Sequence, residues 1–306
     1  MKVAFIGYGG IAKKHSEIIK KINPSAEIFS VKEKLDSDMN NSSAKHIDFK
    51  NISKFNLDAI FITNPSSYHA KSIMDNHNLG IPIMVEKPIC VNRKQLSQLK
   101  QLEKLENPKI YCACNMRFHP MVTFLKRHLK NNYSKINEVN IYCGSYLPYW
   151  RKGVDYRENY SAKKSHGGGV NFDLIHEIDY LVYLLGFPSG CKKFQSKVSN
   201  LEIDSNDFSH YCFKYDSFFA MVTLNYFRKD KKRYMEIVRE DGTIMADFEN
   251  QKILNSTTNE ILFNLNYNGM EKSYELQMEY FFESINRSQF NINGLKEAVE
   301  IMKIIL

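Results

Sequence analysis

The stretch Lys2-Val3-Ala4-Phe5-Ile6-Gly7-Tyr8-Gly9-Gly10-Ile11-Ala12 begins with a short apolar run that stops at a glycine. A run of this kind predicts a buried parallel strand over Lys2 to Ile6. Helical periodicity follows from Ile11 to Ile22 and ends near Asn23-Pro24. The order strand, tight turn, helix is how a doubly wound α/β domain opens.

The glycines of this stretch fit the pattern G-x-G-x-x-A. Gly7 allows the tight turn, Gly9 lets the backbone approach a pyrophosphate, and the small Ala12 lets the helix pack against the strand. The helix begins at Gly10 and Ile11, so its positive end would face the phosphate charge. The stretch therefore predicts a dinucleotide-binding turn; a glycine turn without a ligand is the alternative.

Outward from this turn, strands and helices alternate as far as residue 117. Alternation with tight loops predicts a parallel, doubly wound sheet, so residues 1–117 are expected to form a Rossmann domain. The further strands are expected at 26–31, 57–63, 81–85 and 110–115, and the further helices at 68–78 and 93–105.

The pattern changes beyond residue 117. Runs of alternating apolar residues between 208 and 248 predict antiparallel strands, with hairpin turns at Asp216-Ser217 and Asp241-Gly242. Residues 118–306 are therefore expected to form an α+β domain with an open antiparallel sheet, used for substrate binding and oligomerisation. The expected helices of this domain are 120–130, 170–185, 275–285 and 294–306, and a strand is expected at 138–147.

Composition bounds the class of protein. The chain has 306 residues, 43% hydrophobic and 25% charged, which is typical of a globular protein with two domains. It carries 42 Lys+Arg against 34 Asp+Glu, but the positive residues are scattered. The densest run, Arg228 to Arg233, is interpreted as a solvated hairpin turn, so no nucleic-acid partner is expected; a moderate positive field that attracts an anionic substrate remains open.

Other composition signals concern location and metals. Six cysteines form no C-x-x-C pair, and Cys112 and Cys114 lack nearby residues to complete a zinc site, so reduced thiols and no metal are expected. No apolar run approaches the ~18 residues that span a bilayer, so no membrane partner is expected. The first glycine comes too early for a signal peptide, and a cytoplasmic location is predicted.

The end of the second strand bears on cofactor choice. NAD enzymes usually place an acid there to bind the ribose hydroxyl. Here the strand ends Phe29-Ser30-Val31-Lys32-Glu33, and Lys32 stands about 25 residues after Gly7. The Ser30 hydroxyl and the Lys32 ammonium suit a 2′-phosphate, which favours NADP, whereas Glu33 keeps NAD open.

Two further segments carry candidate catalytic groups. Lys87 follows the buried strand at 81–85, and a lysine at the carboxyl end of a parallel strand points to the ligand crevice. Asp173 and His176 stand three apart on an expected helix, so they would share a face. A carboxylate beside an imidazole sets its tautomer and raises its pKa. The alternatives are a surface lysine and a structural histidine.

Together these motifs resemble the Gfo/Idh/MocA oxidoreductases, the glucose-fructose oxidoreductase and inositol dehydrogenase family, over essentially the whole chain. The resemblance implies a tightly held NAD or NADP and hydride transfer at a hydroxyl-bearing carbon of a sugar or cyclitol. Lys87, Asp173 and His176 match its catalytic residues, although the family commonly spaces the last two by four. The implied cofactor-binding residues are Gly7, Gly9, Gly10, Ile11, Ala12, Ser30, Lys32, Asn64, Pro65, His69, Glu86, Lys87 and Arg117.

A narrower resemblance lies in Ser145 to Arg151 and Asp155 to Ala162. These segments are similar to a subgroup found with surface-polysaccharide and nonulosonic-acid sugar genes. Arginines beside aromatic rings suit an acidic or nucleotide-activated sugar, whereas an ordered loop with solvated cations is the alternative. The expected substrate-binding residues are Lys87, Tyr149, Trp150, Arg151, Arg157, Asp173 and His176, with Lys163 and Lys164 as further cations and Tyr156 and Tyr160 as further rings.

The predicted function is that of an NAD(P)-dependent sugar dehydrogenase or reductase in surface-glycan biosynthesis. The alternatives are a non-catalytic sensor of dinucleotide or sugar, and NAD-assisted epimerisation or elimination. The family's open sheet is often covered by a partner subunit, and the run Phe218 to Leu224 has an apolar face that needs cover. A homodimer or homotetramer is therefore expected.

Overall fold

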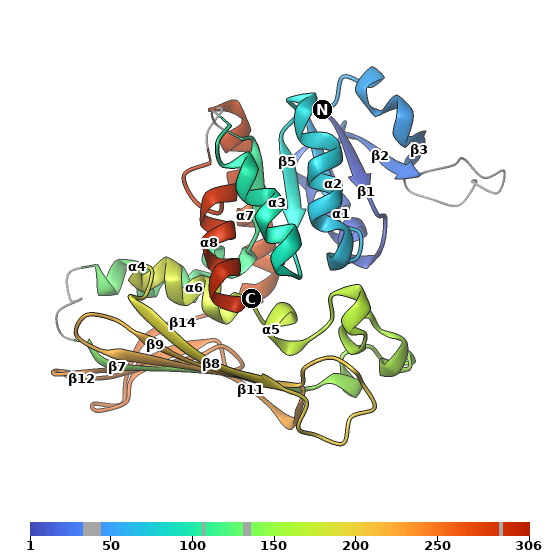
Figure 1. The fold of residues 1–306 in the computed structure, drawn as a ribbon. Coiled ribbons are helices and arrows are strands. Elements are labelled where there is room, and N and C mark those ends of the chain that lie inside the picture. The colour runs from blue at the N-terminus through green and yellow to red at the C-terminus, as the bar shows by residue number, and fades with distance from the viewer. Residues whose placement is uncertain (33–43, 106–107, 131–135, 288–289) are drawn as a thin grey trace. The chain divides into compact units, whose positions relative to one another are not determined.

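The computed structural model describes residues 1–32, 44–105, 108–130, 136–287 and 290–306 (Figure 1). These residues form two compact units. Unit 1 comprises Met1–Cys114 and Tyr274–Leu306, and unit 2 comprises Asn115–Ser273. The division differs from the expected domains of 1–117 and 118–306, because the C-terminal segment packs with the N-terminal one.

Unit 1 contains a six-stranded sheet in the order β3-β2-β1-β4-β5-β6, all parallel. Its central strand β1 has Val3, Ala4 and Phe5 fully buried, as a strand covered on both faces requires. The expected Rossmann fold is confirmed. The strands are β1 (Lys2–Ile6), β2 (Glu27–Lys32), β3 (Lys45–Asp48), β4 (Ala59–Ile62), β5 (Ile83–Glu86) and β6 (Ile110–Ala113).

Helices connect these strands. The apolar side of α1 (Gly10–Ile22) buries Ala12, Ile18 and Ile19, and its lysines face outward. The expected helix at 68–78 is shorter, because a 3₁₀ turn follows Asn76 and Gly80 ends it with a φ of 69°. The other helices of unit 1 are α2 (His69–Asn76), α3 (Arg93–Leu102) and α8 (Leu295–Ile305), with most of α7 (Gly269–Asn286).

The C-terminal segment completes the core of unit 1. In α8, Val299, Met302 and Ile305 are buried. Before it, the Asn293 carbonyl accepts a hydrogen bond of 2.8 Å from the amide of Cys112, at the edge strand β6. Because the backbone of β6 binds this segment, unit 1 is built from both ends of the described chain.

Unit 2 contains an eight-stranded sheet in the order β14-β13-β12-β11-β7-β10-β9-β8. Its neighbours are antiparallel except β7 and β10, which are parallel. The expected second sheet domain is thus confirmed, although one of its strand pairs is parallel where we expected antiparallel pairing throughout. The strands are β7 (Ile136–Tyr146), β8 (Gly190–Ser196), β9 (Phe208–Lys214), β10 (Phe219–Asn225), β11 (Phe227–Arg239), β12 (Gly242–Asp247), β13 (Lys252–Asn255) and β14 (Glu260–Asn264).

The basic run Arg228 to Arg233 is not the hairpin turn that we expected. It lies inside β11, across a register shift between Phe227 and Lys232. The strands β10 and β11 do not pair with each other but lie on either side of β7. At the end of this run, Arg233 pairs with Glu177, which is buried on α6.

Helices α4 (Pro120–Leu129) and α6 (His176–Leu185) lie over one face of the unit 2 sheet, with the short α5 (Val170–Asp173) (Figure 1). The core between them includes Val139, Ile141, Val222, Leu224 and Ile237. Period-2 burial in these strands follows from cover on a single face.

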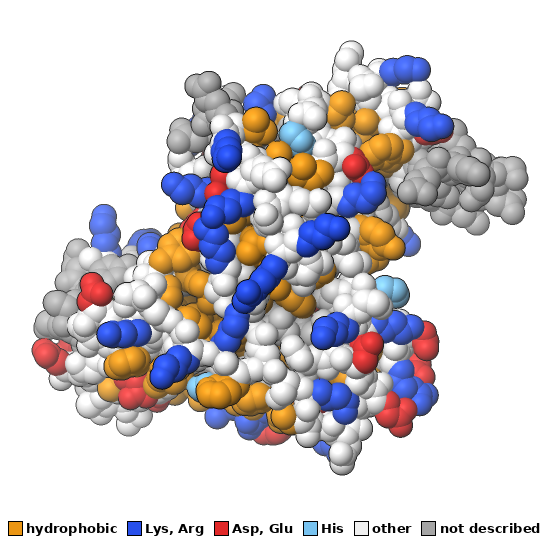
Figure 2. Space-filling model, viewed as in Figure 1, with side chains coloured by type: hydrophobic (Ala, Val, Ile, Leu, Met, Phe, Trp, Pro, Cys, Tyr) orange, Lys and Arg blue, Asp and Glu red, His pale blue; other side chains and the backbone are white. Residues whose placement is uncertain are grey.

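Three structural findings bear on the class of protein. Among the described residues, no helix is long and apolar enough to cross a membrane, and no group of three or more His, Cys, Asp or Glu is placed to hold a metal ion. No disulfide joins the six cysteines, all of which are described. In the view of Figure 2, lysine and arginine side chains are interspersed with acidic and uncharged ones.

Candidate active site

The turn after β1 gives its glycines different roles. Gly7 has a φ of +89°, and a Cβ there would lie 2.5 Å from the Cα of Asn64, so only glycine fits. A Cβ at Gly9 or Gly10 would meet nothing within 4 Å. No side chain caps the first turn of α1, so its amide N–H groups face this open space. The turn therefore leaves room for a phosphate at a helix N-terminus.

The end of β2 lies beside this turn. In the parallel register Ile6 is opposite Val31. Lys32 and Gly7 therefore both lie at the carboxyl end of the strands. Ser30 is buried within the sheet, and the side chain of Lys32 lies outside what the structure describes. Glu33, the competing acid, lies outside the described residues. The preference for NADP therefore stays a prediction from the sequence.

The segment that carries Lys87 is held through Glu86. The His15 imidazole on α1 is buried, and its Nε2 lies 2.7 Å from Glu86 Oε1. Burial raises the pKa of Glu86, but the hydrogen bond and charge of His15, with the charge of Lys87, outweigh it, so the pKa is lowered. Glu86 is thus an anion that joins α1 to the end of β5.

His69 holds the other side of the same segment. It is buried, with Nδ1 2.7 Å from the Pro88 carbonyl and Nε2 2.8 Å from the Asn64 carbonyl. Burial lowers the pKa of His69 against the effect of these carbonyls. The histidine joins the Asn64-Pro65 turn to Lys87-Pro88. We expected His69 to contact the cofactor. In the structure both of its ring nitrogens instead bond the backbone carbonyls of these two turns.

These contacts fix the backbone on both sides of Lys87. Lys87 itself is partly exposed. Sequence reasoning missed His15, because its partner Glu86 is 71 positions away. One signal was available: His15 occupies the inner face of α1, three residues after Ala12, where apolar residues would otherwise stand.

In unit 2, Asp173 and His176 do not share one helix as predicted. Asp173 ends α5, Leu174 leaves the helical region at φ −99° and ψ 30°, and His176 begins α6. The break follows the glycine triplet. A Cβ at Gly168 would lie 2.3 Å from the Tyr160 carbonyl, so the close approach of two backbones requires glycine.

The contacts of Asp173 are with tyrosines. The hydroxyl of Tyr226 donates to Asp173 Oδ2 at 2.5 Å, and Tyr160 hydrogen-bonds the same carboxylate. The carboxylate's charge and burial raise the pKa of Tyr160, and burial and that charge raise the pKa of Tyr226, so both remain neutral donors. The rings of Trp150 and Tyr226 pack at right angles, with their centroids 5.2 Å apart. Sequence reasoning missed the tyrosine contacts of Asp173.

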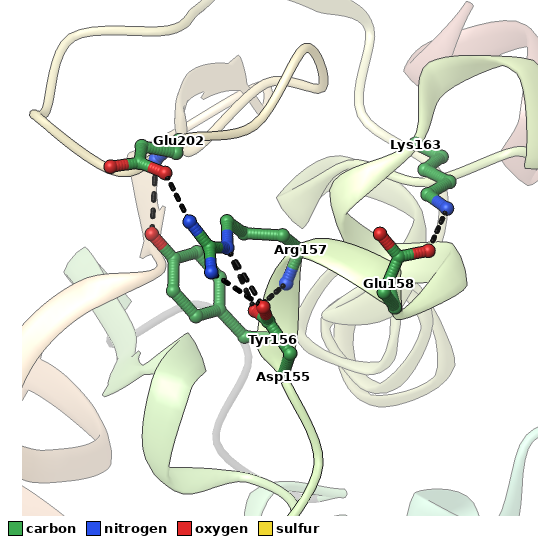
Figure 3. A network of polar contacts seen from close by, with 6 residues as sticks. All are labelled: Asp155, Tyr156, Arg157, Glu158, Lys163 and Glu202. Atoms are coloured by element: carbon green, nitrogen blue, oxygen red, sulfur yellow. Dashed lines mark hydrogen bonds and ion pairs between the residues drawn. The ribbon is translucent and has the colours of Figure 1, made fainter.

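Two of the cations in the loop after β7 are paired with acidic residues (Figure 3). Arg157 forms ion pairs of 2.7 Å with both Asp155 and Glu202, and Lys163 one of 2.6 Å with Glu158. Exposed pairs of this kind add little stability, but they neutralise the charges that were expected to attract an acidic sugar. The alternative interpretation, an ordered and tethered loop, fits these residues better.

The aromatic part of this loop differs from its cationic part. The Arg151 guanidinium lies 5.6 Å over the ring of Tyr160 and has no acidic partner among the residues described. Tyr149 is 69% exposed, with its ring 4.8 Å from that of Tyr146. Arg151, Trp150 and Tyr160 thus gather around Asp173, whereas Arg157 is occupied elsewhere.

Arg117 also has a partner that the sequence did not predict. Its Nε and Nη2 donate to Asp179 at 2.9 and 2.7 Å, and both residues are buried. A buried guanidinium needs such a bidentate partner. Arg117 belongs to unit 2, with Asp173 and His176, whereas Lys87 and the dinucleotide turn belong to unit 1.

Comparison with known proteins finds a family similarity in the N-terminal part of unit 1. Residues 1–112 match the Gfo/Idh/MocA family model, described as an oxidoreductase family with an NAD-binding Rossmann fold. Inositol 2-dehydrogenase of Corynebacterium glutamicum (strain R) is 24% identical over 131 residues, which are 42% of this chain and 36% of that protein. Residues 1–112 therefore resemble the NAD-binding Rossmann domain of that family.

Solved structures extend the similarity to the whole fold. Myo-inositol 2-dehydrogenase from Lactobacillus plantarum has a TM-score of 0.78 at 16% identity, with 100% of this chain and 95% of that one covered. A levoglucosan dehydrogenase in complex with NADH and levoglucosan has a TM-score of 0.83 at 14% identity, with 100% and 95% covered. At such identities these likenesses establish the fold.

Proposed function

We propose that this protein is an NAD(P)-dependent oxidoreductase that transfers a hydride to or from a hydroxyl-bearing carbon of a sugar or cyclitol. One observation carries the proposal. In the domain that matches the family model, Lys87 and the dinucleotide turn both lie at the carboxyl end of the parallel strands. The segment that carries Lys87 is held by hydrogen bonds of His15 and His69. A merely solvated lysine needs no such support.

The turn after β1 has room for a dinucleotide cofactor. The space at Gly9 and Gly10 would take the pyrophosphate, and the N-terminus of α1 would face its charge. The bound nicotinamide supplies or accepts the hydride. The cofactor is proposed to be NADP or NAD, with NADP favoured because an ammonium at Lys32, the last residue of β2, suits a 2′-phosphate.

The chain's own groups would handle the proton and the charge. Lys87 would hold the reacting hydroxyl oxygen and stabilise the negative charge that develops on it. His176 would take or give the proton. Asp173 would orient the substrate within its cluster of Tyr160, Tyr226 and Trp150. Asp173 would also orient His176, as the family resemblance implies.

The substrate proposal is narrower than the function. We propose an acidic or nucleotide-activated sugar of surface-glycan biosynthesis, recognised by Arg151. The support is that Arg151 lies beside Tyr160 and has no acidic partner in the described chain. The ion pairs of Arg157 and Lys163 remove them from this proposal. The competing class is an uncharged polyol, suggested by the names of the inositol and levoglucosan dehydrogenases.

Self-association is a further part of the proposal. The open face of the unit 2 sheet carries large exposed apolar side chains, of which Phe194 is 68%, Phe219 51% and Ile261 62% exposed. Apolar groups of this kind are typical of protein interfaces. We propose a homodimer or homotetramer in the cytoplasm, and light scattering after size exclusion would give the subunit count.

The experiment that tests the function combines binding and turnover. Thermal shifts with NAD(H) and NADP(H) identify the cofactor, since a ligand of the native state stabilises it. Absorbance at the reduced-nicotinamide band then screens inositols, neutral sugars, sugar acids and nucleotide-activated sugars. Product analysis separates dehydrogenation from epimerisation or elimination. A cofactor shift with no product from any class would favour the sensor alternative.

Lys32→Asp should shift cofactor preference toward NAD by at least about tenfold. An acid at the end of β2 repels a 2′-phosphate and accepts from ribose hydroxyls. The measurement is the ratio of dissociation constants for NADPH and NADH. Lys94→Ala, an exposed change on α3, is the matched control. An unchanged ratio in Lys32→Asp would place the ribose away from Lys32.

Arg151→Gln should raise KM for the acidic substrate by about 10- to 100-fold with a smaller effect on kcat, because a charge-assisted pair is worth about 1.5–3 kcal/mol. The control is Arg157→Gln, whose guanidinium is already held by Asp155 and Glu202. Equal effects in both variants, or none with Arg151→Gln, would contradict recognition of an anionic group by Arg151.

A further inference from the structure

Unit 2 contains a cavity of about 750 Å³ that the proposed reaction does not use. It lies between the start of α4, the basic part of β11 and the segment that joins β14 to α7. Its polar lining includes His119, Lys231, Arg233, Gln251, Asn266 and Asn268. The size is that of a site for a small metabolite.

His119 supplies a neutral N–H group to this cavity. The side chain is 3% exposed, and its Nδ1 accepts the Met121 amide at 3.3 Å, which caps α4. Burial, with the charge of Arg233, lowers the pKa of His119 to about 4. The neutral ring therefore carries its proton on Nε2. No described residue accepts from Nε2, so a buried donor is left for the cavity.

Arg233 supplies a charged fork. Its Nε donates to Glu177 at 2.6 Å, while its two terminal nitrogens have no hydrogen-bond acceptor in the described part of the chain. Burial lowers the pKa of Arg233, but the charge of Glu177 outweighs it and the pKa is raised. The guanidinium, 13% exposed, thus stays charged with two NH₂ groups available.

Two of the three amide side chains of the lining, Gln251 and Asn268, already use their oxygens as acceptors. Gln251 Oε1 accepts from the Gly269 amide at 2.7 Å, and Asn268 Oδ1 from the Met270 amide at 3.1 Å. What each side chain still offers is its NH₂ donor. The Glu249 carboxylate, also in the lining, is paired with Lys231 at 2.9 Å. The cavity is therefore rich in unused donors and poor in unused acceptors.

We propose that this cavity is a second ligand site, which binds the carboxylate or phosphate group of a small anionic metabolite through Arg233 and His119. A planar guanidinium fork beside a neutral N–H suits an oxyanion, whose oxygens accept several hydrogen bonds. The chain's formal charge of +8 favours the approach of such a ligand. The site is formed by unit 2 alone, so the proposal does not depend on the redox function.

The test titrates the full chain, labelled with ¹⁵N-histidine, separately with inorganic phosphate and with acetate at constant ionic strength set by chloride. The His119 ring signals are those lost in His119→Asn, a change that keeps an acceptor for the α4 cap. We expect these signals to shift saturably with at least one anion. Saturation with phosphate, acetate or both supports the site and identifies its preferred group; no saturable shift with either anion overturns it.

Asn266→Asp provides the matched variant, because Asn266 makes no hydrogen bond in the described structure and the change is isosteric. A carboxylate in the cavity should weaken anion binding by about tenfold or more. The control is Asn200→Asp, exposed between β8 and β9 at the opposite edge of the sheet from β14. Equal weakening in both variants would show a general charge effect and overturn the proposal. A selective loss in Asn266→Asp supports it.

Discussion

Lys87→Ala is expected to lower the rate of hydride transfer by about 10²–10³-fold, which is typical for loss of one electrostatic group at a developing oxyanion. The dinucleotide affinity should change little, because the phosphates would bind backbone amides near Gly9 and Gly10. The structure strengthens this expectation: the anchoring contacts are made by the side chains of His15 and His69 to Glu86 and the Pro88 carbonyl. Removing the Lys87 side chain leaves them intact.

The measurement is single-turnover hydride transfer beside cofactor affinity, with Lys94→Ala as the control for loss of an exposed lysine. Lys87→Arg adds a variant that keeps the charge but changes its geometry. Near-normal transfer in Lys87→Ala would remove the lysine from the mechanism and leave His176 as the candidate proton carrier. An equal loss of cofactor affinity would instead indicate a structural role for the segment.

Gly9→Val is expected to abolish dinucleotide binding while the melting temperature of the protein without ligand stays within about 2 °C, since surface changes usually alter stability by less than about 0.5 kcal/mol. A side chain at Gly9 meets no protein atom within 4 Å, so it would occupy only the space proposed for the pyrophosphate. Gly7→Val should behave differently, because it clashes with Asn64 and has a positive φ, and should destabilise the fold.

The readout for Gly9→Val is the thermal shift that NADH and NADPH produce. Gly190→Val, at the start of an edge strand in unit 2, repeats the same change where a Cβ meets only Lys214 at 3.8 Å. Cofactor stabilisation of normal size in Gly9→Val would mean that the phosphate turn lies elsewhere. A large loss of stability without ligand would mean that valine disturbs the turn itself.

The parts of the fold that could be predicted are those whose signal is local. Central strands such as β1 and β4 are continuous apolar runs, and α1 has a clear apolar face. The edge strand β3 was missed, because only Ile47 of its four residues is buried and the run therefore looks polar. The turn expected at Arg228 to Arg233 was wrong for a related reason: Arg233 satisfies a buried acid on α6, and no local pattern reveals that partner.

The candidate site likewise has local features that could be predicted from the sequence and long-range contacts that could not. The glycine turn and Lys87 are recognisable because each motif lies within a few residues. The supporting pairs join residues far apart in sequence: His15 with Glu86, Asp173 with Tyr226, and Arg117 with Asp179. Charge alone misled at Arg157, since the sequence shows the cation but not the acid 45 positions later that neutralises it.

The discontinuity of unit 1 has a consequence for biosynthesis. Its strand β6 hydrogen-bonds Asn293, and its core includes α8, so unit 1 lacks part of its interior until the last described residues have been made. Unit 2, whose residues 115–273 are contiguous, can emerge whole from the ribosome before that point. Domains usually fold N-terminal first during synthesis. We expect the opposite order here, because unit 2 can complete its core while unit 1 still lacks α8.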